Sequence, residues 1–292
     1  MRSFTRMNLA LLALAVTSVL PVAFSPPASA GAEEYRLLEL DGHMVKWGDR
    51  QLGVGASISY AFATETLRFD DAINCRDMEP IEAISGRNLS METLAREAAA
   101  AFRVWESAAD LSFHQVGDAR DADIILGAQG RPHGRAFASV TYAPNAEDGV
   151  RTIEQALVCL NPDHGWKVGF DGNEDVYDIR YTLVHEIGHA IGLDHPGPSG
   201  QVMAFRYTEA FDDLQPGDLL GVQRLYGPAT GLDARLAEES SETYHAHDLI
   251  GDSLMNTTLG LGASHQSGAC QPQNGKRNLT SCGFTDGTTE QQ

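Results

Sequence analysis

Five residues at fixed spacing within positions 182–196 could hold a metal ion and use it. They fill the pattern HExxHxxGxxH and are His185, Glu186, His189, Gly192 and His195. Two histidines four positions apart lie on the same face of a helix, so both imidazoles can reach one ion. A glycine can turn the chain at the end of that helix and bring the third histidine back as a ligand. Three imidazoles and a water form a tetrahedral zinc site with one open position, which is the arrangement of a catalytic zinc.

Glu186 follows the first histidine and has a different predicted role. From this position a glutamate can hydrogen-bond to a water on the metal without being a ligand itself. It is therefore the candidate general base. The pentapeptide HExxH alone can occur by chance on a helix whose histidines face solvent. Five fixed positions in eleven are too specific for that explanation.

The spacing of apolar residues predicts the strands and helices that hold these residues in place. Ile58, Tyr60 and Phe62 alternate with small or polar residues, as in a half-buried strand. Ser90 is a good N-cap for a helix, and apolar residues at helical spacing give that helix one core-facing stripe. The stripe consists of Met91, Leu94, Ala98, Phe102 and Trp105.

Further elements are predicted on both sides of the metal-binding helix. Extended segments are expected at 111–116, 123–126, 134–143 and 156–160, and 70–85 is expected to be a loop. Asp175 or Asn173 is expected to cap the metal-binding helix. A last helix is expected between Pro216 and Gly227, because proline suits a helix start and glycine its end.

The segments after the third histidine resemble the matrixin branch of the metzincin endopeptidases. A methionine, Met203, is followed at the fourth position by Tyr207, and the stretch 214–227 has the form L...D..GxQ.LYG. The resemblance covers about residues 45–228. It implies an α+β (α/β) fold with a twisted, mostly parallel five-stranded sheet and three helices.

The same resemblance assigns roles to residues outside the metal motif. Met203 would lie under the metal as a packing residue, and Tyr207 would contact the substrate or the transition state. An extended substrate would pair with an edge strand. The residues of that strand are Phe137, Ala138, Ser139 and Val140.

Some positions depart from the matrixin pattern. Phe205 replaces a usual proline, Gly217 an acidic residue, and Ser139 occupies the position of a histidine that binds a structural zinc. The expected cofactor is therefore one catalytic Zn²⁺. Ca²⁺ is a second candidate cofactor, although an EF-hand reading of Asp171, Asn173, Glu174 and Asp175 would place Val176 where glycine is required. No cysteine lies between residue 30 and Cys75, so a thiol switch on the zinc is not expected.

Composition indicates an exported protein. Residues 1–30 are predicted to be a signal peptide, 31–228 the catalytic domain, and 229–292 a flexible, low-complexity tail. Without residues 1–30, 19 Lys and Arg face 40 Asp and Glu, a net charge of -21, which argues against nucleic acid and anionic membranes as partners. Of the three pairings open to four cysteines, Cys75–Cys159 with Cys270–Cys282 is preferred.

The sequence therefore predicts a secreted, monomeric zinc endopeptidase, extracellular or periplasmic, that acts on proteins or peptides and is not bound to a membrane after signal cleavage. One alternative is a serralysin-like metzincin peptidase, suggested by Leu193–Gly197. It is disfavoured by Phe205 and by the lack of calcium repeats after Gly227. The other alternative is an exported binding module that holds zinc without turnover.

Overall fold

The computed structural model describes residues 35–72, 74–86, 89–143 and 149–229, together with the backbone of 271–272 and 280–282. The predicted signal peptide, most of the tail and the side chains of the Cys270–Cys282 pair lie outside the described residues. Within the described part, none of the helices is both long and apolar enough to cross a bilayer.

The central sheet contains the five strands that the sequence predicts. Its core order is β7 (Leu111–Gln115), β4 (Ala56–Phe62), β8 (Ile124–Gln129), β10 (Arg151–Leu160) and β9 (Ala136–Tyr142). The first four are parallel to one another, and β9 is antiparallel to β10. The predicted mostly parallel sheet of an α+β fold is therefore confirmed.

Short strands extend this sheet or pair beside it. β2 (Glu39–Leu40) pairs with β3 (His43–Lys46), which joins β10, while β5 (Leu67–Arg68) pairs with β6 (Asp77–Glu79), which joins β8. β1 (Arg36–Leu37) pairs with β13 (Leu193–Asp194), and β11 (Trp166–Lys167) with β12 (Tyr177–Asp178). Two further strands come from the predicted tail, β14 (Gln271–Pro272) and β15 (Thr280–Cys282). Two short 3-10 helices span Ile81–Ile84 and Ala119–Asp121.

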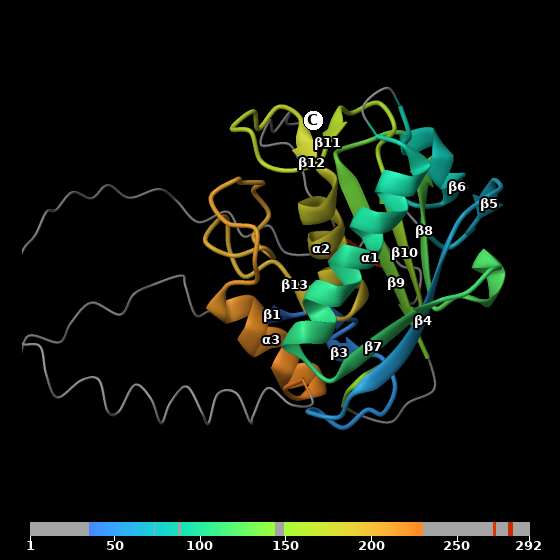
Figure 1. Cartoon of the computed structure of the whole chain (residues 1–292). Coiled ribbons are helices and arrows are strands. Elements are labelled where there is room, and N and C mark those ends of the chain that lie inside the picture. The colour runs from blue at the N-terminus through green and yellow to red at the C-terminus, as the bar shows by residue number, and fades with distance from the viewer. Residues whose placement is uncertain are drawn as a thin grey trace, which may run out of the picture. The chain divides into compact units, whose positions relative to one another are not determined.

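Of the three α-helices among the described residues, two pack together against one face of the sheet (Figure 1). The helices are α1 (Met91–Ala108), α2 (Ile179–Ala190) and α3 (Pro216–Tyr226). α1 begins at its predicted cap, because the Ser90 side chain accepts a hydrogen bond from the Thr93 amide. The Trp105 ring nitrogen donates to the Val184 carbonyl at 3.0 Å, which joins α1 to α2 at the centre of the core.

The opposite face of the sheet is also covered, which corrects one prediction. Alternation predicted a half-buried strand at Ile58–Phe62, but Ser59 and Ala61 are buried as well. Ala61 belongs to a second apolar cluster that contains the disulfide between Cys75 and Cys159. That disulfide confirms the first preferred pairing. The predicted loop 70–85 contributes β6 to this cover, because Met78 belongs to the second cluster. The 3-10 helix in the same stretch buries Ile81 and Ile84 in the first core cluster.

Candidate metal centre

The three histidines of the motif meet at one point. Their Nε2 atoms lie 3.0 to 3.1 Å from one another, and all three residues are buried. Zinc–nitrogen bonds of 2.0–2.1 Å in tetrahedral geometry place the nitrogens about 3.3 Å apart, so the triad is close to the size that zinc requires. Among the described residues, no other group of three or more potential ligands is found.

The other ring nitrogens fix how two of these imidazoles are protonated. His185 Nδ1 lies 2.7 Å from the Val202 carbonyl, and His189 Nδ1 lies 2.8 Å from the Leu193 carbonyl. A carbonyl can only accept, so each Nδ1 carries the proton and each Nε2 presents a lone pair. The short contact between Nε2 of His185 and Nε2 of His189 is therefore not a hydrogen bond. Both lone pairs point to the place where one cation can bind them.

Burial keeps these imidazoles neutral. It lowers the pKa of His185 well below the usual range, and the neighbouring His189 and His195 lower it further. Burial also lowers the pKa of His189 to about 4, although the Leu193 carbonyl opposes the shift. Because neutral imidazole is the form that binds metals, the site is ready for a metal at neutral pH.

α2 supplies two of the ligands and the glutamate, and it begins at a cap that the sequence analysis missed. The Asp178 side chain accepts a hydrogen bond from the Tyr181 amide at 2.7 Å, so Asp178 is the N-cap, and not Asp175 or Asn173. Those two residues lie outside the helix in a loop that forms its own turns, such as Asp175 N–H to Asn173 Oδ1 at 3.2 Å. Glu186 is completely buried on α2, one residue after the first ligand.

Gly192 makes the predicted turn. Its φ is 101°, in the left-handed region, and an added Cβ would lie 2.4 Å from the Val45 carbonyl oxygen. Both conformation and space therefore require glycine there. The turn leads into β13 and brings His195 back beside the first two ligands.

Asp218 holds the segment that contains Met203. Its carboxylate accepts hydrogen bonds from the amides of Val202 at 2.9 Å, Met203 at 3.0 Å and Gln215 at 2.9 Å. Burial raises the pKa of Asp218, although these amides favour its charged form. The Val202 carbonyl in turn orients His185, so α3 positions a metal ligand through this carboxylate. The sequence motif contained Asp218, but its spacing gave no sign of this role.

Met203 packs against α2 between the two ligand positions of that helix. A Cβ added at Gly188 would lie 2.2 Å from the Met203 sulfur and 2.9 Å from Trp105. Glycine is thus needed for this close approach. Met203 therefore packs on α2, and its place under the metal stays a prediction.

Arg36 and Asp194 form a contact that sequence reasoning did not find. Arg36 Nε lies 3.0 Å from Asp194 Oδ2, with the carboxylate side chain 3% exposed and that of the arginine 46% exposed. Asp194 also accepts a hydrogen bond from the amide of His195 at 2.7 Å. The N-terminal strand β1 therefore supports the third ligand. A charged residue beside a ligand was the only available signal, and it gave no indication of the partner.

Tyr207 is held by two hydrogen bonds. Its hydroxyl accepts from the Asp178 amide at 2.9 Å and donates to Glu209 Oε1 at 2.9 Å. Burial raises its pKa. The ring and hydroxyl thus stabilise the start of α2, and contact with a substrate stays a prediction.

The predicted substrate strand is β9, whose residues Phe137, Ala138, Ser139 and Val140 are buried. α2 packs against β9, and Arg135 lies directly before it. Arg135 is buried with its guanidinium 3.6 Å from the Tyr177 ring centre, and its charge contributes to lowering the pKa of His185. The start of β9 is therefore within electrostatic reach of the metal ligands.

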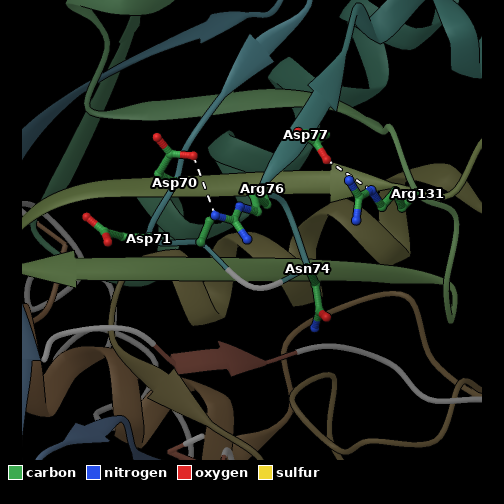
Figure 2. A pocket seen from close by; sticks show the side chains of 7 residues that line it. Asp70, Asp71, Asn74, Arg76, Asp77 and Arg131 are labelled. Atoms are coloured by element: carbon green, nitrogen blue, oxygen red, sulfur yellow. Dashed lines mark hydrogen bonds and ion pairs between the residues drawn. The ribbon is translucent and has the colours of Figure 1, made fainter. Parts of the chain in front are cut away.

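A separate hollow lies around β6 (Figure 2). Its lining residues are Asp70, Asp71, Ala72, Asn74, Arg76, Asp77 and Arg131. Figure 2 shows two of its carboxylates beside arginines, with Asp70 3.5 Å from Arg76 and Asp77 3.1 Å from Arg131. These acids are paired with cations, and none of the three histidines lines the hollow. It is distinct from the metal centre.

The loop 171–175 contains the residues that the sequence offers as calcium ligands. Asp171 pairs with Lys167, and Lys167 also contacts Glu209. Glu209 in turn accepts hydrogen bonds from the amides of Asp171 and Gly172. These groups join the loop to the segment after Met203, and the calcium site stays a prediction.

Comparisons with known proteins show which family this chain resembles. The family model for matrixins matches residues 81–227, about half of the chain. Similar proteins include matrix metalloproteinase-16 of Homo sapiens, 31% identical over 145 residues that are 44% of this chain and 23% of that protein. Matrix metalloproteinase-19 of Mus musculus is 32% identical over 151 residues, 49% of this chain and 26% of that protein.

A third relative is interstitial collagenase B of Mus musculus, 30% identical over 148 residues, which are 48% of this chain and 30% of that protein. The chain thus spans only about a quarter of the length of the first relatives. The matched region includes α1, the three histidines, Met203 and the helix that holds it through Asp218. The chain belongs to the matrixin family.

Proposed function

We propose that this protein is a secreted zinc-dependent endopeptidase that hydrolyses peptide bonds in extended polypeptides. The observation that carries the proposal is the convergence of three buried imidazoles on one point, with a buried glutamate one residue after the first of them. Membership of the matrixin family implies that zinc is the metal. A zinc ion bound there supplies a Lewis acid and lowers the pKa of a bound water to about 7.

Glu186 is proposed to move the proton. It accepts a proton from the attacking water and transfers it to the nitrogen of the leaving amine, as general base and then general acid. Its place on α2 next to His185 supports this role, since a side chain there points near the metal but not along a ligand direction.

β9 is proposed to align the substrate. An extended peptide that adds to a sheet edge gains main-chain hydrogen bonds and is held straight beside the ligands. The packing of α2 on β9 supports this placement. The protein is proposed to act as a monomer outside the cytoplasm on protein or peptide substrates, with one zinc ion.

The test is the change Glu186→Gln, with zinc content, melting temperature and peptide hydrolysis measured on one preparation. The variant is expected to keep one zinc and the fold and to lose turnover by on the order of 10² to 10⁴, the usual range for a general base. Glu154→Gln is a matched control, because Glu154 is exposed on β10. Wild-type rates in the Glu186 variant would remove it from the mechanism.

Two further results bear on the same proposal. Casein digestion that stops on chelation supports the endopeptidase, while a folded, zinc-loaded protein that cleaves neither casein nor gelatin would favour the zinc-holding binding module. Two zinc ions per chain would contradict the single site.

A further inference from the structure

The outer edge of β9 is occupied by the chain itself. Strand β15 pairs with β9 in the antiparallel sense, with Thr280 opposite Val140, Ser281 opposite Ser139 and Cys282 opposite Ala138. β14 continues the sheet on the far side of β15. Without these two strands, β9 would be the last strand of the central sheet.

The occupied positions are those assigned to the substrate. β15 covers Ala138–Val140, three of the four residues of the proposed substrate strand, and α2 with its metal ligands packs against that strand. Each main-chain N–H and C=O on an edge bonds to one neighbouring strand at a time. A substrate that pairs with these residues must therefore first displace β15.

We propose that β15 is an internal competitor for the substrate edge, so that the C-terminal segment holds the enzyme in a closed state that extended polypeptides must open. The inference rests on the proposed function, because only that function makes β9 a substrate edge. The occupant is Thr280–Cys282, supported on its outer side by β14.

The tethered strand β15 and a free substrate strand compete for the same edge of β9. Covalent attachment makes the pairing of β15 intramolecular, so it competes at a high effective concentration. The pairing is only three residues long, and two-stranded additions of this size are marginally stable, so the edge opens at an accessible free energy. The apparent KM rises by the inverse of the open fraction, about tenfold if one molecule in ten is open. The kcat of the open state is unchanged.

The experiment uses the zinc-loaded full chain and its Thr280→Pro/Ser281→Pro variant. Proline lacks an amide hydrogen, and successive residues of a strand direct their amides to opposite sides. The pair of changes therefore removes at least one β9-facing amide, whether Ser281 or its two neighbours face β9. Thr288→Pro/Thr289→Pro is the matched control, since it adds the same number of prolines outside β14 and β15.

The expected result has two independent parts. For an extended peptide substrate, the strand variant lowers KM severalfold at constant kcat, and the control does not. Hydrogen exchange in 136–142 becomes faster in the strand variant only, because the outward amides of β9 lose their partner. A synthetic peptide of residues 278–284 then inhibits the strand variant competitively, and a scrambled peptide does not.

Equal KM values and equal exchange in the strand variant and wild type, with both proteins active, would overturn the inference while leaving the endopeptidase intact. An unchanged KM with faster exchange would also overturn it, since β15 would then cover a strand that substrates do not need. If no form of the protein cleaves any substrate despite full zinc, the proposed function fails instead, and the exchange result separates the two cases.

Discussion

The two ends of the described chain each add a short strand to the catalytic machinery, but at different places. β1 pairs with β13 next to the third histidine, while β15 pairs with β9 along the proposed substrate edge. Around β1, Leu38 and Leu40 are completely buried or nearly so, and Arg36 forms an ion pair with Asp194. In the described part of the C-terminal segment, the contact consists of three main-chain register pairs.

This difference separates two tasks that the protein needs. A strand fixed by buried side chains can permanently stabilise the metal loop, residues 191–195, which carries the third ligand. Removing such a strand would expose apolar surface. A strand added by a few main-chain pairs can leave and return. We therefore expect changes near β1 to affect stability and metal affinity, and changes in β15 to affect access of substrate.

The largest expected effect comes from Leu38→Ala. Leu38 is completely buried, and its amide donates to the Gly192 carbonyl at 2.8 Å, at the turn that places His195. The change is expected to lower the free energy of unfolding by about 2–5 kcal/mol, as for other buried leucines. Urea unfolding measures it, with Leu220→Ala as the control, since Leu220 is 47% exposed. Equal losses in both variants would mean that the N-terminal segment does not fix the metal loop.

A slightly smaller effect is expected from acid on the metal-free protein. Burial lowers the folded-state pKa of His189 from 6.5 to about 4, so the unfolded chain binds more protons between these two values. The free energy of unfolding should then fall as the pH falls through this window, by about 3 kcal/mol in total for this residue. Urea titrations of chelator-treated protein at several pH values measure the slope.

Hydrogen exchange at the same pH values measures how acid affects the two chain ends separately. As the pH falls, β1 and β13 should lose protection from exchange first, because they pair beside the third ligand. The strand β9 should keep its protection. His189→Gln should reduce the slope because it removes a titrating group. An unchanged slope in that variant would assign the pH dependence to other residues.

The smallest effect is expected from Arg36→Ala. Removal of the guanidinium takes away the ion pair between Arg36 and the buried Asp194 and loosens the residue before the third ligand. Zinc affinity should fall about tenfold, the lower end of the range for groups that support metal ligands. Competition with a chelator measures it. Arg120→Ala, which breaks an exposed pair with Glu65, is the control and should leave zinc affinity unchanged.

A zinc affinity that is the same in the Arg36 variant and in wild type would show that the ion pair with Asp194 does not support the third ligand. β1 would then be a structural strand without influence on the metal. KM for an extended peptide should not change in this variant, because β1 pairs with β13 in a separate two-stranded sheet and β9 belongs to the central sheet.

Features that depend on neighbouring residues can be predicted from the amino-acid sequence alone. The spacing of His185 and His189 is a property of one helix, and Gly192 follows that helix directly, so the three ligands could be identified without a structure. The Ser90 cap and the apolar stripe of α1 are local in the same way. The five central strands could be predicted because each carries its own apolar pattern.

Contacts between segments that are distant in the sequence are visible only in the folded protein. Nothing in the sequence around Arg36 indicates Asp194, and nothing around Asp218 indicates the amides of Val202 and Met203, because these contacts form only after the strands and helices have packed. The N-cap of α2 is Asp178 because β12 brings it to the helix start, whereas Asn173 and Asp175 are used by their own turns. β15 was not predicted either, since it forms by main-chain pairing to an edge, which requires no apolar pattern of its own.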